Sequence, residues 1–295
     1  MLLDTLEEDM QRLRARWPKD WPGMPWVLDS CLRSLDHPES LAPLSASTAA
    51  AERYRVLRDG AGALAGALED WHAKRAAEGR EAPYHNRLHF ADCMLALCTL
   101  LKAARSHTAS ADAALQAQQM DAPALHAQEM LLLLIVLAHD LQHDGRVNSA
   151  PMEMESLSAT AAVSLLRNLG LSGQDLAILE QTIRHTDPAV VPANHRAVAG
   201  RRFSLEDPQW LQVLANEADI LASTLPGLGT SLAQELAREW SVAHPAMAQR
   251  VVSDAGRLFF LEHVALFSSP ASHLLGLDGI RQQQIDALRA RLHAP

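Results

Sequence analysis

Histidine and carboxylate side chains follow directly on the most apolar stretch of the chain. Residues 130–138 carry no charge, His139 and Asp140 come next, and His143 follows three residues later. The run is too short to cross a bilayer, so it predicts a buried helix that ends inside the protein. A carboxylate at such a position has to be paired, hydrogen-bonded or bound to a metal. The adjacent imidazole makes a divalent cation one candidate, and a buried His–Asp hydrogen bond is the alternative.

Two further groups could join this site. His85 and His89 have the i, i+4 spacing that places both imidazoles on one face of a helix, so one could bind a metal while the other stays free. Taken alone, the pair is also compatible with surface residues or helix caps. Asp219 lies on the expected inward face of another helix, whereas Glu217 is expected to point outward. Imidazoles and aspartates together suit zinc, iron or manganese, with magnesium at an oxygen-rich neighbour.

The elements that would position these residues are all helices. Alanine and leucine dominate, β-branched and aromatic residues are scarce, and no stretch alternates apolar and polar residues over six or more positions. We therefore expect an all-α fold, with one compact multi-helix domain and a helical appendage at the N-terminus. Apolar spacing and cap signals predict helices near residues 2–16, 47–77, 84–104, 127–141, 151–169, 172–185, 208–224, 231–244, 247–267 and 278–292.

Three segments are expected to lack continuous helix. Residues 17–26 contain three prolines and are expected to form an irregular joint whose tryptophans pack on the domain. Residues 105–126 are rich in Ala, Gln and Ser, and are expected to form an exposed, partly helical insertion without chemistry. Residues 186–195 are expected to form a loop.

The net charge and the cysteine pattern exclude some classes of function. The 295 residues carry 26 Lys and Arg against 35 Asp and Glu, a net charge of −9, which argues against a nonspecific grip on nucleic acid or an anionic membrane. A phosphate site would need local positive charge, which metal ions could supply. The three cysteines include no Cys-x-x-Cys pair, and no signal peptide is visible, so we expect a reduced, cytoplasmic protein.

Two motifs resemble the paired signature of the class I cyclic-nucleotide phosphodiesterases, a branch of the HD-type metal-dependent phosphohydrolases. The first is YHNRLHFAD at residues 84–92, and the second is HDLQHDGRVN at residues 139–148. Their order, with Asp219 downstream after an alanine, makes the combination specific. The resemblance implies the all-α phosphodiesterase fold and a hydrolytic activity.

The resemblance also implies a role for individual residues. The tighter ion, zinc or iron, would be bound by His89, His139, Asp140 and Asp219. Asp140 would bridge to a second ion, magnesium or manganese. The residues that match those holding water around the second ion are His143, Glu155 and Thr186. His85 matches the general acid, and the substrate-contact candidates are Tyr84, Asn148, Arg257 and Phe260.

The chemistry fits these residue types independently of the family. Two cations roughly 3.5 to 4 Å apart can clamp the oxygens of a phosphodiester and lower the pKa of a bridging water, so that hydroxide attacks near neutral pH. The departing alkoxide then needs a proton, which His85 can supply. An acidic neighbour would keep His85 protonated.

The chain departs from the family pattern at several points. Asp144 stands where the family usually has proline, and adds an acid close to the metals. The insertion between the motifs is longer than usual, and the stretch 140–219 is shorter than in the animal enzymes. Arg257 replaces the glutamine that reads the purine, while Phe260 is kept. A guanidinium cannot make the same contact with a purine as the amide of glutamine, which argues against purine recognition of the family's kind. The residues implied in hydrolysis are not affected by this difference.

Three functions follow in order of preference. The first is a metal-dependent phosphodiesterase acting on a 3′,5′-cyclic nucleotide, with residues 46–295 as the catalytic domain and residues 1–45 as an appendage and joint. The second is a broader phosphodiesterase or phosphomonoesterase in which Arg257 contacts a phosphate. The third is a non-catalytic helical module. The expected partner is a small-molecule phosphate ester, not nucleic acid or membrane, and an apolar helix face could serve a homodimer as well as a core.

Overall fold

The computed structural model describes residues 2–38, 49–110 and 122–293, and this part of the chain forms fourteen helices and no strand. The all-α prediction is therefore confirmed. The helices are α1 (Leu2–Arg16), α2 (Met24–Ser34), α3 (Ala49–Ala77), α4 (Arg87–Ser110), α6 (Ala122–Ala138), α7 (Glu153–Arg167), α8 (Gly173–Arg184), α9 (Val191–Ala197), α10 (Pro208–Thr224), α11 (Gly229–Trp240), α12 (Pro245–Val251), α13 (Asp254–His263), α14 (Pro270–Leu274) and α15 (Leu277–Leu292).

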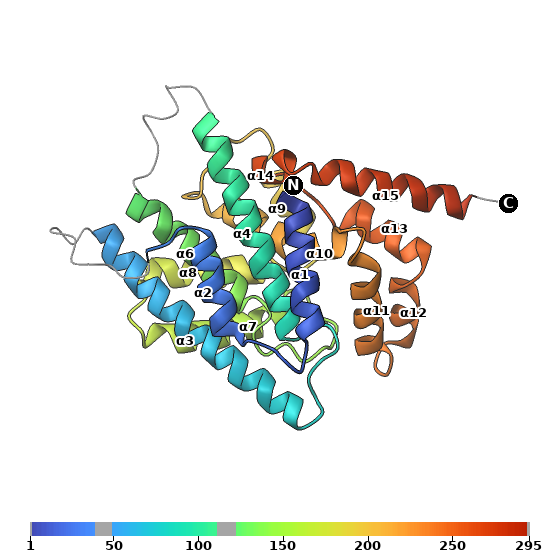
Figure 1. Ribbon diagram of the computed structural model, residues 1–295, viewed down its shortest axis with the longest axis horizontal. Helices are drawn as coiled ribbons and strands as arrows, with labels where there is room; N and C mark the ends of the chain where they lie inside the picture. The colour runs from blue at the N-terminus through green and yellow to red at the C-terminus, as the bar shows by residue number, and fades with distance from the viewer. Residues whose placement is uncertain (1, 39–48, 111–121, 294–295) are drawn as a thin grey trace.

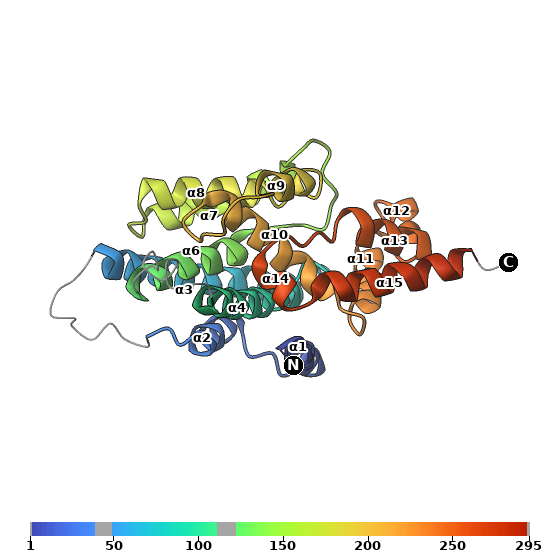
Figure 2. The same cartoon turned by 90° about the horizontal axis from the view of Figure 1, so that it is seen from above.

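Helix α6 is the apolar run, and it lies at the centre of the core. Every residue from Met130 to Ala138 is buried. A helix that is apolar all round can be stable only if other elements cover each of its faces. Helices α3, α4, α8 and α10 pack against it. Viewed from above, α3, α4 and α6 form a middle layer, with α1 and α2 below it and α7, α8 and α9 above (Figure 2).

The C-terminal helices gather at one end of this layered body. Helices α11, α12, α13 and α15 lie together beyond α10 (Figure 1). Helix α10 begins as the sequence predicts, because Asp207 accepts a hydrogen bond from the backbone N–H of Gln209 and Pro208 occupies the first turn. It therefore connects the layered body to the C-terminal helices, and it carries Asp219 between them.

The N-terminal helices pack into the same core as the rest of the chain. Leu6, Met10 and Leu13 of α1 are buried, and α1 packs on α4. Arg14 forms a two-pronged ion pair with Asp92 of α4, in which Nη1 lies 2.7 Å from Oδ1. The expected boundary between residues 45 and 46 lies outside the described residues, so the division into two parts stays a prediction.

Two helices occur where irregular structure was expected, and both corrections have the same cause. Helix α2 begins at Met24, with Pro25 in its first turn, and α9 begins at Val191, with Pro192 in its first turn. Proline is tolerated there because the first backbone N–H groups of a helix have no partner within the helix. Trp17 and Trp21 of the joint do pack against the core, as expected, whereas Trp26 is 45% exposed.

The predicted helix 247–267 is wrong as a single element. It is divided into α12 and α13, because Ser253 accepts a hydrogen bond from the backbone N–H of Gly256 and so starts a new helix. The short helix α14 was not predicted, although Ser269 caps it in the same way. Within the described ranges, no helix combines the length and apolar character that crossing a membrane would need.

The segment 105–126 was expected to be exposed, partly helical and without chemistry, and its described ends fit that expectation except at Arg105. Helix α4 continues to Ser110 and α6 begins at Ala122, while residues 111–121 lie outside the described part of the chain. Ser106, His107 and Ala122 are exposed. Arg105 is partly buried and binds both oxygens of the buried Glu129, and its Nε lies 2.6 Å from Oε1.

Candidate metal centre and active site

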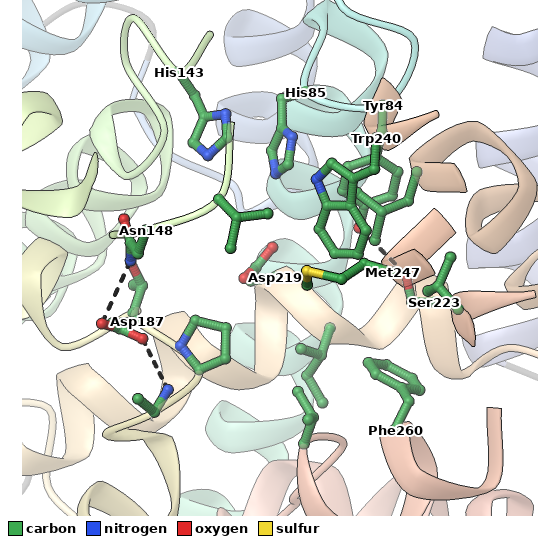
Figure 3. Close-up of a pocket in the computed structure, with 18 of the residues that line it drawn as sticks. Tyr84, His85, His143, Asn148, Asp187, Asp219, Ser223, Trp240, Met247 and Phe260 are labelled. Carbon is green, nitrogen blue, oxygen red and sulfur yellow. Dashed lines mark hydrogen bonds between the residues drawn. The ribbon is translucent and has the colours of Figure 1, made fainter. Parts of the chain in front are cut away.

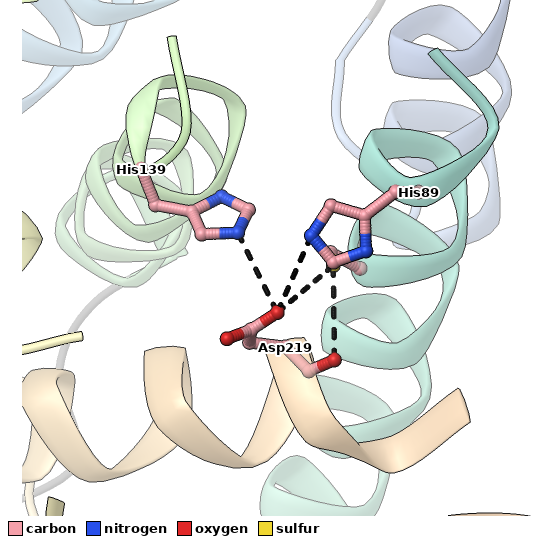
Figure 4. A group of neighbouring side chains, drawn as sticks. His89, His139 and Asp219 are labelled. Carbon is pink, nitrogen blue, oxygen red and sulfur yellow. Dashed lines mark hydrogen bonds and ion pairs between the residues drawn. The ribbon is translucent and has the colours of Figure 1, made fainter. Parts of the chain in front are cut away.

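Two histidines and two aspartates from three parts of the chain meet at one point. His89 comes from α4, His139 and Asp140 from the turn after α6, and Asp219 from α10. The Nε2 atoms of His89 and His139 lie 3.4 and 3.6 Å from Oδ1 of Asp219, and each lies 3.3 Å from Oδ2 of Asp140. Figure 4 shows both imidazoles turned toward the Asp219 carboxylate. The structure thus brings together all four predicted ligands.

The donor set fits a divalent transition metal. His139 donates its Nδ1–H to the carbonyl oxygen of Val136 at 2.7 Å, which leaves a lone pair on Nε2. That Nε2 is buried and has no hydrogen-bond partner among the described residues. Nitrogen and oxygen ligands at tetrahedral zinc lie about 3.3 to 3.5 Å apart, given bonds of about 2.0 to 2.2 Å. The spacing between the imidazoles and carboxylates matches this edge length.

Without a cation, the buried charges of the cluster shift the pKa values of its side chains away from their ordinary ranges. Burial would lower the pKa of His89 and His139, but Cys93 and the two aspartates outweigh it and raise both pKa values well above their usual range. Burial would raise the pKa of Asp140, but the imidazoles, His139 first, lower it well below its usual range. A divalent cation can replace protons on the imidazoles as the counter-charge of the carboxylates.

Cys93 is a neighbour of the cluster that the sequence did not single out. It lies one helical turn after His89, and its Sγ is 3.8 Å from Oδ1 of Asp219. The same sulfur is 3.7 Å from both ring nitrogens of His89. A sulfur at equal distances from the two nitrogens does not lie along the lone pair of either. It does belong, with His89, His139 and Asp219, to a group whose possible ligand atoms all lie within 4.8 Å of one another. We assign the four ligand positions to the two imidazoles and the two aspartates.

His85 stands at the edge of this cluster and is held by a carboxylate that the sequence did not reveal. Its Nδ1 lies 2.5 Å from Oε1 of Glu239, at the end of α11, and its Nε2 lies 3.8 Å from Oδ2 of Asp140. The other oxygen of Glu239 accepts the backbone N–H groups of Tyr84 and His85, each at 2.9 Å. Burial opposes ionisation of Glu239, but His85 lowers its pKa to about 2. The acidic neighbour expected for the general acid is therefore Glu239.

His143 and Gly145 are the other close neighbours of His85 and Glu239. The ring of His143 stacks on that of His85 with 3.8 Å between centroids, and its Nδ1 accepts the backbone N–H of Gly145. Burial, followed by the charge of His85, lowers the pKa of His143 to about 4, so His143 is neutral near pH 7. Gly145 has φ +89°, and a Cβ there would lie 2.9 Å from Cγ of Glu239. Only glycine fits both the turn and this contact.

Of the residues expected around a second ion, His143 lies beside His85, whereas Glu155 and Thr186 line another side of the cavity. Asn148 donates to Oε2 of Glu155 at 2.9 Å and, more weakly, to Asp187 at 3.4 Å. Its carbonyl oxygen accepts the backbone N–H of Met154, so the side chain fixes the start of α7. Burial raises the pKa of Glu155. Thr186 also lines the cavity and donates to the carbonyl oxygen of Ile183.

These side chains share a cavity of about 560 Å³. His85, His143 and Asp219 line one part of it, and Asn148 and Asp187 lie at another side (Figure 3). The remaining wall is mainly apolar and includes Ile220, Leu236, Trp240, Met247, Val251 and Phe260. A phosphate ester could thus place its charged group at the histidines and aspartates and its organic part against the apolar wall.

Three of the substrate-contact candidates, Tyr84, Asn148 and Phe260, line this cavity, and the fourth, Arg257, does not. Arg257 instead lines a smaller adjoining cavity of about 70 Å³, and its Nη2 donates to Oε1 of Gln284 at 3.0 Å. Phe260, one helical turn later, lines both cavities, and the guanidinium of Arg257 lies 5.2 Å from its ring centroid. The placement does not favour a contact with a base in the main cavity.

Two acidic residues also differ from expectation. Glu217 does not point outward but is fully buried, and it accepts the backbone N–H groups of Ser268 and Ser269 before α14. Its direction was not evident because α10 is buried on nearly all sides. Asp144 is exposed and pairs with Arg146 at 3.2 Å, and it does not line the cavity. Its charge is therefore compensated outside the metal cluster.

A second histidine cluster lies on the other side of α6, where His37 and His126 approach Glu129. Nε2 of His37 lies 2.8 Å from one oxygen of Glu129, and the guanidinium of Arg105 binds both oxygens. Because the carboxylate is already neutralised by an arginine, this group does not fit a cation. It ties α2, α4 and α6 together instead.

Comparison with known proteins supports the fold. No protein-family model matches the sequence, and no curated protein matches it. Among solved structures, the chain is similar to the Leishmania class I cyclic-nucleotide phosphodiesterase PDEB1, whose structure was determined in complex with IBMX. The two share 16% sequence identity with a TM-score of 0.50, over 88% of this chain and 95% of that one. At this identity the likeness shows a phosphodiesterase-like all-helical fold.

Proposed function

We propose that this protein is a metal-dependent phosphodiesterase that hydrolyses a small phosphodiester, with a 3′,5′-cyclic nucleotide as the first candidate substrate. One arrangement carries the proposal: the cluster around His139 and Asp219 and the His85–Glu239 pair open into the same cavity. A cation-binding cluster beside a histidine held by a carboxylate is what hydrolysis of a phosphodiester requires. The cavity is large enough for a ligand of nucleotide size.

The residues of the chain have distinct tasks in this proposal. His89, His139, Asp140 and Asp219 would hold the tighter ion, and Asp140 would be shared with the second. The chemistry that divalent cations supply at such a site is neutralisation of the phosphate oxygens and acidification of water. The neutral His143 would hold water near the second ion, as would Glu155 and Thr186.

His85 would deliver the proton that the leaving oxygen needs. Its Nδ1 is engaged with Glu239 at 2.5 Å, so its Nε2 is the atom that can donate into the cavity. The ionised Glu239, whose pKa is about 2, fixes the plane of the imidazole. Because Glu239 also accepts two backbone N–H groups, it holds the main chain at His85 as well as its ring.

A substrate panel tests the proposal. The purified protein, supplied with manganese, is assayed against cyclic AMP, cyclic GMP, bis(4-nitrophenyl) phosphate and 4-nitrophenyl phosphate. We expect hydrolysis of the diesters with release of a monoester, and stoichiometric transition metal in the protein. Preference for 4-nitrophenyl phosphate would overturn the phosphodiesterase assignment. Absence of bound transition metal together with no gain of activity on adding manganese would overturn an enzymatic function altogether.

A further inference from the structure

The small cavity beside the main one is an annex with a mainly apolar wall, in which Arg257 is the one charged side chain among the described lining residues. It has a volume of about 70 Å³ and shares five lining residues with the main cavity, namely Tyr84, Ser223, Leu236, Val251 and Phe260. Figure 3 shows Ser223 and Phe260 on the side of the main cavity opposite Asn148 and Asp187. The annex therefore adjoins the apolar end of the cavity, where the part of a substrate remote from the scissile phosphate would lie.

Arg257 lines the annex without an acidic partner. Its hydrogen bond goes to the neutral amide of Gln284, and its guanidinium lies 5.2 Å from the ring centroid of Phe260. Among the described residues, no carboxylate lies within ion-pair distance of it. Desolvation is the cause that lowers the pKa of Arg257 to about 10. A partly buried cation without a counter-ion carries an uncompensated desolvation cost, which an anion in the annex would relieve.

The first residue of α11 lies against the same guanidinium. A Cβ at Gly229 would be 2.3 Å from Nη2 of Arg257, so only glycine leaves room for the arginine here. No side chain caps this end of α11, and its first turn contains no acidic residue. The start of a helix carries a partial positive charge, so it repels the guanidinium rather than neutralising it. The helix start adds to the positive potential that Arg257 creates in the annex.

We propose that the annex binds a second anionic group of the substrate, a carboxylate or a phosphate remote from the scissile phosphodiester. This inference rests on the proposed phosphodiesterase function and changes its first candidate substrate from a simple cyclic nucleotide to a phosphodiester that carries a second anionic group. The annex is too small for a nucleobase but has room for a carboxylate or a phosphate oxygen group. A guanidinium binds such groups through charge-assisted hydrogen bonds. A simple cyclic nucleotide, which has one anionic group, would leave the annex unused.

A matched set of synthetic esters tests this inference. Propyl, 2-carboxyethyl and 2-phosphonoethyl esters of 4-nitrophenyl phosphate share a leaving group and differ in the remote group. We expect kcat/KM to be about tenfold or more higher for a charged ester than for the propyl ester, because a charge-assisted hydrogen bond is worth about 1.5 to 3 kcal/mol. The better of the two charged esters identifies the remote group as a carboxylate or a phosphate.

Variants separate the annex from general attraction of anions. Arg257→Gln should bring the charged-to-neutral ratio of kcat/KM close to one. Gln284→Glu should do the same with the guanidinium still present, because it gives Arg257 an internal carboxylate partner. The control is Arg289→Gln, which removes an equal charge from an exposed arginine of α15 that pairs with Glu262, and it should keep the wild-type ratio.

The outcomes distinguish this proposal from the one on which it rests. Equal kcat/KM for all three esters in the wild type, or an unchanged ratio in the correctly folded Arg257→Gln and Gln284→Glu proteins, would overturn the annex and leave the phosphodiesterase function intact. Hydrolysis of no diester in the presence of manganese would overturn the phosphodiesterase function, and the annex proposal with it.

Discussion

Glu239 holds His85 at two places at once. Its Oε1 lies 2.5 Å from Nδ1 of the imidazole, and its Oε2 accepts the backbone N–H of the same residue at 2.9 Å. The two residues are 154 positions apart in the chain, and the contact joins the end of α11 to the turn before α4. The orientation of the proposed general acid therefore depends on how the C-terminal helices pack on the central layer.

The variant Glu239→Gln tests the electrostatic part of this contact. The amide keeps the shape of the side chain but replaces the charged acceptor at Nδ1 of His85 with a neutral one. We expect kcat on a cyclic nucleotide to fall about 10- to 100-fold with metal content unchanged, because the imidazole loses the carboxylate that orients it. Steady-state rates and metal analysis of both proteins check this. An unchanged kcat would mean that the charge of Glu239 contributes nothing to the role of His85.

Glu239 should also make stability depend on pH in the acid range. Its pKa in the folded protein is about 2, against an ordinary value of 4.5. A depressed pKa stabilises the folded state above the ordinary value, and this contribution is lost as the pH falls from 4.5 to about 2. The gap in unfolding free energy between the wild type and Glu239→Gln should shrink by about 3 kcal/mol across this window. Urea unfolding at several pH values measures it, and a constant gap would contradict the coupling.

Replacing His85 should separate proton donation from metal binding. We expect His85→Ala to keep its metal content and to lose about 10²- to 10⁴-fold in turnover on a cyclic nucleotide, whose alkoxide leaving group needs a proton. Bis(4-nitrophenyl) phosphate should be affected much less, because nitrophenolate leaves without one. Metal analysis and both turnover numbers are needed. Loss of metal equal to that of a ligand variant would contradict the role assigned to His85.

Replacing Asp219 and replacing its neighbour Cys93 should have opposite effects on metal binding. Asp219→Ala should lose transition metal, since its Oδ1 lies 3.4 and 3.6 Å from the two imidazole Nε2 atoms. Cys93→Val should keep it, because the two imidazoles and two aspartates already supply four ligands and the sulfur does not lie along a lone pair of His89. The metal content of both variants after dialysis tests these two expectations. Metal loss in Cys93→Val would make the thiol a ligand and contradict our reading of its position.

Features set by local sequence could be predicted, and those set by distant packing could not. The apolar run before His139 identified the central helix, and Asp207 with Pro208 located the start of α10 to the residue. Both signals act within one or two helical turns. Glu239 gave no such signal, because it stands on an amphipathic helix among charged neighbours, and its role comes from a contact with a distant turn.

The same limit explains two errors. The sequence 247–267 has helical spacing throughout, and the break at Ser253 depends on whether its side chain caps a new helix or continues the old one. Glu217 was expected to face water because a charged side chain usually does, but α10 is covered on nearly every side. Its carboxylate is stabilised by backbone donors from before α14 that no local pattern could reveal.

The ion pair between Arg14 and Asp92 determines whether α1 is an appendage or part of the structural unit. Asp92 is 1% exposed and lies one helical turn after the proposed ligand His89, so it requires the charge that Arg14 supplies. Arg14→Met should lower the unfolding free energy by about 3 to 5 kcal/mol, because it leaves a buried carboxylate unpaired. Adding Asp92→Asn removes that charge, so the double variant should be more stable than the sum of the single effects predicts. Strictly additive effects in urea unfolding would mean that α1 can detach without cost to the helix that carries His89.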